Sequence, residues 1–254
     1  MIDIHSHILP GIDDGALNME EAVSMARIAV DEGIKKVIAT PHHQNGKFFN
    51  NKQYILKKVK EFNDVLQSEN IPLEILPGQE IRIYGSLLDD FEKGDILTLN
   101  HTNYLFVELP SGHVPRYTEQ LLFEIQLKGM TPIIVHPERN AEMLKNPDKL
   151  LNLVKKGALT QLTAGSVTGN FGKKVQKFSM QLIESNSTHF IASDAHNTTT
   201  RSFHMRQSIS KVYKEFGSQV VYYFQENAEL LMRDQPVYKQ EPSKIKCKKF
   251  LGIF

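Results

Sequence analysis

Two histidines, His5 and His7, end a short stretch at the start of the chain in which apolar and polar residues alternate. Residues two apart on an extended strand point to the same side, so both imidazoles can reach one metal ion. Two adjacent carboxylates, Asp13 and Asp14, follow before Gly15. The start of the chain therefore predicts metal binding at the end of a strand.

Later segments repeat this design, because each is an apolar run that ends in a metal-binding type of side chain. The candidate ligands are His5, His7, Asp14, His42, Glu80, Glu108, His136, Asp194 and His196. Asp13 is an alternative to Asp14, because spacing does not separate two adjacent carboxylates. Imidazole and carboxylate ligands without thiolate suit manganese, iron or zinc. So many ligands exceed the needs of one ion, which indicates two or three ions that share carboxylates, an arrangement that hydrolyses phosphate esters.

The apolar runs alternate with stretches of helical periodicity, as in β/α units around a parallel sheet. The predicted strands lie near residues 2–5, 36–40, 74–82, 104–109, 132–136, 159–163 and 189–193. One helix begins after Asn18 and ends at Gly33, and others are predicted at about 53–69, 115–128, 147–156, 173–185 and 201–216. This order favours a closed or nearly closed barrel. The carboxyl ends of its parallel strands would gather the scattered ligands on one face.

The length and charge of the chain limit its class. A chain of 254 residues suits a single α/β barrel, here expected over residues 1–235. Lysine plus arginine (30) nearly balance aspartate plus glutamate (29), so no overall field favours nucleic acid as a partner. The start of the chain has no signal-peptide pattern, and no apolar stretch reaches about 18 residues. With only one cysteine, Cys247, the composition predicts a soluble, cytoplasmic protein without a transmembrane segment or an internal disulfide.

The last residues, 236–254, form a predicted tail that is rich in lysine and ends in apolar residues. A solvated or surface-packed tail is the simpler interpretation. Contact with an acidic partner or a membrane surface is the alternative, because basic residues beside apolar ones support both.

The motifs together resemble a known family, the polymerase and histidinol phosphatase (PHP) superfamily. The segments that carry this resemblance are His5-Ser6-His7, Thr40-Pro41-His42-His43, Gly78-Gln79-Glu80, His136-Pro137-Glu138-Arg139 and Ser193-Asp194-Ala195-His196. More closely, residues 9–15, 136–139 and 194–201 are similar to the bacterial manganese-dependent tyrosine phosphatases of capsule and exopolysaccharide loci, the CpsB/YwqE type. The resemblance covers residues 1 to about 235.

The resemblance implies a distorted (β/α)7 barrel, like a TIM barrel, with a trinuclear metal centre. It implies one ion held by His5, His7, Glu80 and Asp194, a second by Glu80, Glu108 and His136, and a third by Asp14, His42 and His196. It also implies a protein tyrosine phosphatase that uses manganese and acts on a cognate bacterial tyrosine kinase and its substrates, in exopolysaccharide or capsule regulation.

Phosphate binding is assigned to two arginines that follow ligand-bearing strands. Arg139 comes three residues after His136, and Arg201 comes five residues after His196. Guanidinium groups can bind phosphoryl oxygens through two hydrogen bonds each. Arg206 is the reserve candidate. Cys247 has no arginine after it, which excludes the thiol-based mechanism of other tyrosine phosphatases.

Four aromatic residues lie in or beside loops expected at the metal face. They are Phe48, Phe49, Tyr84 and Tyr117. They could stack on a phosphotyrosine ring, and ordinary loop packing is the alternative.

Three other functions compete with the tyrosine phosphatase. One is a different PHP phosphoesterase, such as a histidinol-phosphate phosphatase. A second is an amidohydrolase, which shares a barrel and a His-x-His strand but usually bridges its metals with a modified lysine, where this chain offers Glu80 and Glu108. The third is a non-catalytic protein that binds the kinase.

Overall fold

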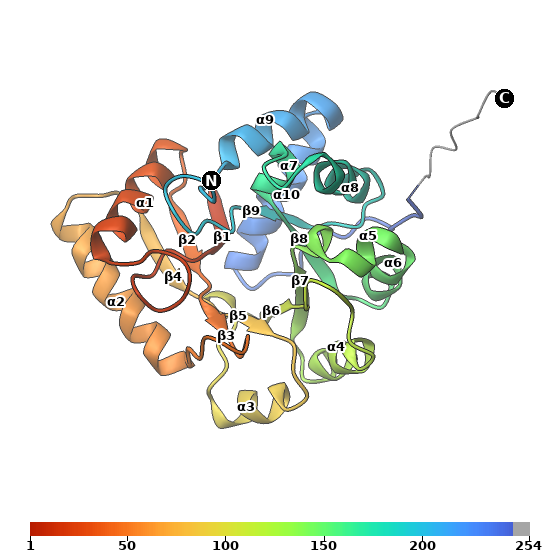
Figure 1. The fold of residues 1–254 in the computed structure, drawn as a ribbon, viewed down its shortest axis with the longest axis horizontal. Coiled ribbons are helices and arrows are strands. Elements are labelled where there is room, and N and C mark those ends of the chain that lie inside the picture. The colour runs from red at the N-terminus through yellow and green to blue at the C-terminus, as the bar shows by residue number, and fades with distance from the viewer. Residues whose placement is uncertain (246–254) are drawn as a thin grey trace.

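The computed structural model describes residues 1–245 of the chain and has the alternating α/β order that the sequence predicts (Figure 1). Its strands are β1 Ile2–Ser6, β2 Lys36–Ala39, β3 His42–His43, β4 Glu74–Pro77, β5 Glu80–Arg82, β6 Tyr104–Glu108, β7 Thr131–Val135, β8 Leu159–Thr163 and β9 Phe190–Ala192. They form two parallel sheets, in the orders β1-β2-β4 and β3-β5-β6-β7-β8-β9. The prediction of a parallel α/β fold is therefore confirmed.

The division into two sheets arises where the chain is interrupted between β2 and β3 and between β4 and β5. The predicted strand 74–82 is wrong as a continuous element, because Gly78 and Gln79 separate β4 from β5. A Cβ atom at Gly78 would lie only 2.6 Å from Cγ2 of Ile38, so glycine allows the chain to bend against β2. The last and first strands meet through a bridge between Ser6 and Ala195 rather than through a continuous ladder.

Helices cover the outside of the strands (Figure 1). They are α1 Met19–Asp31, α2 Lys52–Ser68, α3 Leu87–Lys93, α4 Thr118–Leu127, α5 Ala141–Lys145, α6 Asp148–Lys155, α7 Ala164–Thr168, α8 Lys173–Glu184, α9 Met205–Phe216 and α10 Ser218–Met232, with 3-10 turns η1 Leu99–His101 and η2 Pro137–Arg139. The side chain of Asn18 caps α1 by accepting the N–H of Glu21, as the sequence predicts.

Two helical boundaries differ from the predictions. The helix predicted from residue 201 begins at Met205, and the residues before it form a loop in which Asn197 accepts the backbone N–H of Arg201. Helix α10 was not predicted. Its valine, tyrosine and phenylalanine residues at 220–224 have the preferences of a strand, and packing against α9 and the strands overrides them.

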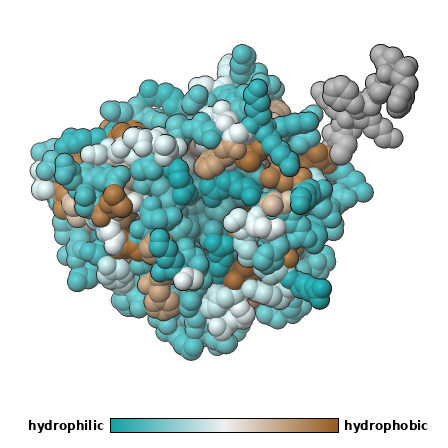
Figure 2. Space-filling model, viewed as in Figure 1, coloured by the Kyte–Doolittle hydropathy of each residue, from teal (hydrophilic) through white to brown (hydrophobic). Residues whose placement is uncertain are grey.

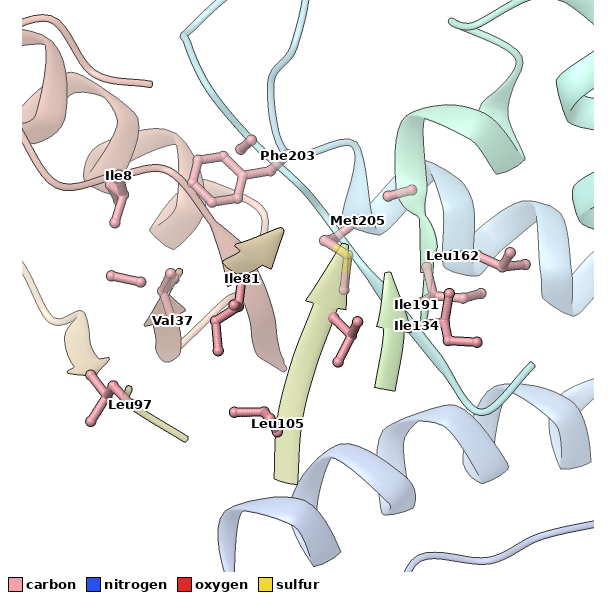
Figure 3. Packing of buried hydrophobic residues seen from close by; sticks show 14 of the residues in the cluster. Ile8, Val37, Ile81, Leu97, Leu105, Ile134, Leu162, Ile191, Phe203 and Met205 are labelled. Carbon is pink, nitrogen blue, oxygen red and sulfur yellow. The ribbon is translucent and has the colours of Figure 1, made fainter. Parts of the chain in front are cut away.

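The apolar interior has two parts. The larger core lies between the strands and the helices, where Ile134, Leu162 and Ile191 point from neighbouring strands toward the helical layer (Figure 3). The smaller core lies on the opposite side of the strands and combines residues of β1, β2, β6, β7, β8 and β9 with residues of α10. Its buried members are Ile4, Ile38, Leu99, Tyr104, Phe106, Ile133, Val135, Leu159, Phe190, Ala192, Ala228, Leu231 and Val237.

Helix α10 and the residues after it close the amino ends of the strands. The Asn227 amide donates to the carbonyl of His189, directly before β9, and the Tyr104 hydroxyl donates to the carbonyl of Gln235. Further along, the Ser243 N–H donates to the carbonyl of Ser185. The tail is thus packed on the surface up to residue 245.

Residues 246–254 lie outside the described residues, so the prediction that the basic tail contacts a membrane or an acidic partner is untested there. Within residues 1–245, no helix is both long enough and apolar enough to cross a bilayer.

Candidate metal centre

The carboxyl ends of the strands bring the predicted ligands together under a hydrophilic surface at the centre of the face seen in Figure 1 (Figure 2). Glu80, at the start of β5, is at the middle of this cluster and is fully buried. Its Oε2 lies 3.2 Å from Nε2 of His7 and 2.9 Å from Nδ1 of His42. Its Oε1 lies 2.7 Å from Nε2 of His136. One carboxylate therefore reaches side chains from three other segments.

Burial alone would raise the pKa of Glu80, but the charges of His42 and His5 outweigh it and hold this pKa well below its usual range. The carboxylate therefore stays ionised without access to water. An ionised, buried carboxylate with several nitrogen neighbours is a suitable bridging ligand for cations.

The first group of ligands surrounds the end of β1. Nε2 of His5 and Nε2 of His7 are 3.3 Å apart, and both face Oε2 of Glu80. Oδ1 of Asp194 lies 3.5 Å from the first nitrogen and 3.4 Å from the second. Asp194 reaches this position with a left-handed backbone, at φ 53°, which is unfavourable for a non-glycine residue. Four of the predicted ligands thus converge on one point.

The third group distinguishes the two adjacent carboxylates. Oδ1 of Asp14 lies 3.4 Å from Nε2 of His42 and 3.6 Å from Nε2 of His196. Asp13 instead binds Nδ1 of His7 at 2.6 Å and accepts the backbone N–H of His42. The structure therefore places Asp14 among the candidate ligands and Asp13 behind His7, where it fixes the imidazole.

Charge and close packing hold Asp13 in this place. Burial opposes ionisation of Asp13, yet the charge and hydrogen bond of His7 lower its pKa to about 2. A Cβ atom at Gly15 would lie 1.9 Å from the carbonyl oxygen of His7, so only glycine lets the loop pass this closely.

The second group lies between β3, β5 and β6. His42, Glu80 and Glu108 offer atoms that all lie within 4.8 Å of one another. Burial and the nearby charge of Glu80 raise the pKa of Glu108 to about 7. His136, which the family resemblance places in this group, contacts Glu80 and has a left-handed backbone at φ 34°. Burial and the charge of Arg139 lower the pKa of His136 to about 4, so its ring is neutral, as a ligand must be.

The residues fit metal ions by their chemistry and by their unsatisfied atoms. Among residues 1–245, several buried side-chain atoms in the cluster make no hydrogen bond of acceptable geometry: Nδ1 of His42, Oε2 of Glu80, Oε2 of Glu108 and Nε2 of His196. Buried polar atoms normally have partners, and leaving them without one is costly. A cation would satisfy these atoms and relieve the repulsion between the two glutamates.

Both predicted arginines reach the same carboxylate at the edge of the cluster. Nη1 of Arg139 lies 2.7 Å from Oδ2 of Asp194, and Nη2 of Arg201 lies 3.2 Å from it. Burial alone would raise the pKa of Asp194, but Arg139 in particular holds it well below its usual range. The prediction of Arg206 as the reserve phosphate-binding residue was wrong. Arg206 is on α9, and its backbone N–H donates to Glu32 at the end of α1.

Three residues at the site were not predicted from the sequence. Arg82, two residues after Glu80 on β5, binds Glu108 at 3.1 Å. Gln161 of β8 bonds to Nδ1 of His5 at 2.9 Å, and the ring of Phe171 lies 5.1 Å from the guanidinium carbon of Arg139. The alternation of β5 indicates the first of these and a polar residue inside β8 indicates the second. No sequence signal marks Phe171, because its role depends on a loop.

The four aromatic residues differ in their surroundings. The ring of Phe48 is nearly parallel to that of His42, with centroids 6.3 Å apart. Phe49 lies against His43 and is 61% exposed. The hydroxyls of Tyr84 and Tyr117 donate to Asp90 and to the carbonyl of Ile83. Of the four, Phe48 is the one with its ring against a candidate ligand.

The chain matches the family model for capsular polysaccharide synthesis, CpsB/CapC, over residues 1–233. It belongs to this family. It is 50% identical to the tyrosine-protein phosphatase YwqE of Bacillus subtilis over 254 residues, which is 100% of both chains. It is 29% identical to the tyrosine-protein phosphatase CpsB of Streptococcus pneumoniae, over 86% of this chain and 92% of that one. The family resemblance noted from the motifs is thereby confirmed.

Solved structures agree with this assignment. A crystal structure from work on YwqE and CpsB, described as unique metal-dependent tyrosine phosphatases, matches with a TM-score of 0.95 and 50% identity, over 97% of this chain and 100% of that one. An organophosphorus hydrolase variant from Deinococcus radiodurans matches with a TM-score of 0.55 and 12% identity, over 91% and 92% of the two chains. This second match concerns the fold alone.

Proposed function

We propose that this chain is a metal-dependent tyrosine-protein phosphatase. The observation that carries the proposal is the convergence at Glu80, whose two oxygens contact imidazoles of β1, β3 and the end of β7, while two arginines meet at Asp194 beside it. The activity attributed to its relatives YwqE and CpsB supports it.

We propose three ion positions among these side chains. The first ion would take His5, His7, Glu80 and Asp194; the second Glu80, Glu108 and His136, with His42 adjacent; the third Asp14, His42 and His196. Bound ions in such a centre neutralise phosphoryl charge and activate a water molecule. Manganese is the proposed metal, with iron or zinc as alternatives, because the ligands are nitrogen and oxygen only.

The protein's own groups would bind and orient the phosphate. Arg139 and Arg201 each offer a guanidinium edge near Asp194, and two such edges can hold phosphoryl oxygens by paired hydrogen bonds. The buried Nε of Arg201 has no hydrogen-bond partner among residues 1–245, so it is available as a further donor. The departing tyrosine has a pKa of about 10, so its phenolate leaves more readily than an alkoxide.

The proposed substrates are a cognate bacterial tyrosine kinase and the proteins it phosphorylates, in the control of capsule or exopolysaccharide synthesis. The family to which the chain belongs supports this setting. The reaction is placed in the cytoplasm, where a kinase obtains ATP. Residues 1–235 are proposed to form one PHP-type domain, a distorted seven-stranded barrel, followed by the tail.

The proposal is tested by stripping the protein of metal and measuring its hydrolytic activity before and after metal is restored. Manganese, iron or zinc is restored separately, and phosphate release from a phosphotyrosine peptide is compared with release from histidinol phosphate. We expect metal-dependent turnover with a preference for phosphotyrosine. Faster hydrolysis of histidinol phosphate would assign the site to another phosphoesterase, and kinase binding without turnover of either compound would indicate a non-catalytic partner.

A further inference from the structure

A large groove lies on the outside of the molecule, and none of the candidate metal ligands lines it. It has a volume of about 850 Å³ and is lined by α5, α8 and α9 together with Ile245, near the end of the described chain. Its apolar lining includes Leu144, Phe178, Met180 and Phe216. Those four side chains pack against the outer core, so the floor of the groove is fixed by the fold.

Lysines dominate the polar lining of this groove. They are Lys145, Lys173, Lys174, Lys177 and Lys211, against two carboxylates, Glu184 and Glu215. Within residues 1–245, none of these lysines has a carboxylate oxygen within 4.0 Å, the limit for an ion pair. Elsewhere on the molecule many surface lysines are paired, as Lys36 is with Glu74 and Lys128 with Glu92, although others are not. The groove therefore concentrates unneutralised positive charge on a chain whose net charge is only +1.

One end of the groove lies toward the proposed phosphate site, because α8, which lines the groove, packs against the turn η2 that carries Arg139. Phe171, whose ring lies over the guanidinium of Arg139, is separated from Lys173 only by Gly172. From there α8 carries Lys174 and Lys177 away from the site, at about 1.5 Å per residue. An extended peptide advances about 3.3 Å per residue, so a few residues beside a bound phosphotyrosine would span these lysines.

We propose that this groove, which we call the lysine groove, binds an acidic segment next to the phosphotyrosine of the substrate protein. This inference rests on the proposed function and adds a preference for substrate sequence. Carboxylates of the substrate would pair with the lysines, and its apolar side chains would pack on Phe178 and Met180. Opposite charges placed in this way steer association and select partners.

The remaining residues of the chain itself are a poorer occupant. Residues 246–254 contain Lys246, Lys248 and Lys249 and no aspartate or glutamate. Like charges facing each other are unfavourable, so the lysine groove complements an acidic peptide better than it does this tail. A recessed groove with an apolar floor also suits a peptide chain better than the flat surface of a membrane.

Matched peptides and matched variants test the proposal with the full chain loaded with manganese. Two phosphotyrosine peptides differ only in the residues next to the phosphotyrosine, which are glutamates in one peptide and glutamines in the other. The variant Lys174→Glu with Lys177→Glu reverses two charges of the lysine groove. The control, Lys57→Glu with Lys60→Glu, makes the same change with the same spacing on the exposed face of α2.

We expect the unchanged protein to prefer the acidic peptide, and the groove variant to lose about 10-fold in kcat/KM on it through KM. Turnover of the neutral peptide and the behaviour of the control variant should stay unchanged. Equal activity of the unchanged protein on both peptides, or an equal loss on both in the groove variant, would overturn the proposal.

A binding measurement separates this proposal from the proposed function. Fluorescence anisotropy of the acidic peptide without phosphate reports on the lysine groove even if no phosphatase activity is found. Binding that is lost in the groove variant and kept in the control supports the groove. The same measurement is made with vesicles of phosphatidylcholine that contain 30% phosphatidylglycerol. If the peptide does not bind, while the vesicles bind the unchanged protein and not the groove variant, the groove is a membrane contact and the proposal is wrong.

Discussion

The carboxyl and amino ends of the strands, on either side of one apolar interior, differ in how well their buried polar groups are paired. At the carboxyl ends, buried histidines and carboxylates crowd around Glu80, and several of their atoms lack hydrogen-bond partners within residues 1–245. At the amino ends, α10 covers the interior with Ala228 and Leu231, and the side chains of Asn227 and Tyr104 donate hydrogen bonds to the backbone carbonyls of His189 and Gln235. The carboxyl ends therefore keep an unfavourable electrostatic energy that a bound cation would relieve, whereas the backbone carbonyls named at the amino ends are already hydrogen-bonded.

The comparison teaches where stability and function reside in this fold. Conservative changes at the amino ends should reduce stability and leave the site intact, because function is concentrated on the opposite face. Single changes of charge at the carboxyl ends should remove metal binding and should also weaken the metal-free fold, because removing one buried charge leaves its neighbours uncompensated.

The largest expected effect is at the centre of the metal site. Replacement of Glu80 by Gln removes the charge that two of the candidate ligand groups share, so turnover should fall by about 10³-fold or more. Metal content measured by mass spectrometry should fall in parallel, and the urea midpoint of the metal-free protein should also fall, because His5 and His42 lose the buried charge that pairs with them. A variant that keeps its full metal content would contradict the bridging role of Glu80.

The opposite end should respond through stability. Leu231→Ala leaves a cavity beneath the strands, with an expected loss of about 3 kcal/mol in the free energy of unfolding. Metal bound per folded molecule should be unchanged. Leu127→Ala, at a side chain 70% exposed on α4, is the control and should change stability by less than about 0.5 kcal/mol. Loss of metal in the Leu231 variant, without unfolding, would show that the two ends are not separate.

The proposed phosphate-binding edge of the site distinguishes metal binding from phosphate binding. Arg139→Lys keeps a positive charge but removes the flat guanidinium that binds Asp194 and faces Phe171. We expect turnover about 10²-fold lower, the size of the loss when one preorganised donor is removed. Metal stoichiometry should stay that of the unchanged protein. If the metal is lost together with activity, Arg139 supports the ligands rather than the phosphate.

The smallest effect concerns acid sensitivity at the amino ends. Burial, together with the charge of Lys239, lowers the pKa of His189 to about 3. In the unfolded chain the pKa of His189 is near 6.5. Between pH 3 and pH 6.5 the unfolded state therefore binds more protons than the folded state, so stability falls as the pH drops below about 6.5. At pH 5 this costs about 2 kcal/mol.

His189→Gln should remove this part of the pH dependence. Urea unfolding of metal-free protein at pH 7 and pH 5 measures it, and a variant with the same loss of stability as the unchanged protein would exclude His189 as its source.

The residues at the carboxyl ends of the strands could be predicted from the sequence better than the helix that covers the amino ends. The convergence of the candidate ligands could be predicted because each stands at the end of an apolar run, and parallel strands bring such ends together whatever lies between them. Asp13 and Asp14 could not be separated, because their roles depend on which oxygen the tight loop at Gly15 directs toward His7. Helix α10 was missed because its residues 220–224 have the local preferences of a strand.

Contacts between loops were equally out of reach. Phe171 meets Arg139 only after α7 and its following turn have formed, and Arg206 belongs to α9 rather than to the site loop because the helix starts at Met205. The break at Gly78 also has a tertiary cause, the side chain of Ile38 on the neighbouring strand.

The central claim is that the convergent side chains form a centre for several metal ions. Diffraction from crystals soaked in manganese, with data collected on both sides of the manganese absorption edge, tests it directly. We predict anomalous peaks on both sides of Glu80, one beside His5, His7 and Asp194 and another toward Glu108 and His136, with a third near Asp14 and His196. A single peak, or peaks only at surface carboxylates, would contradict the account.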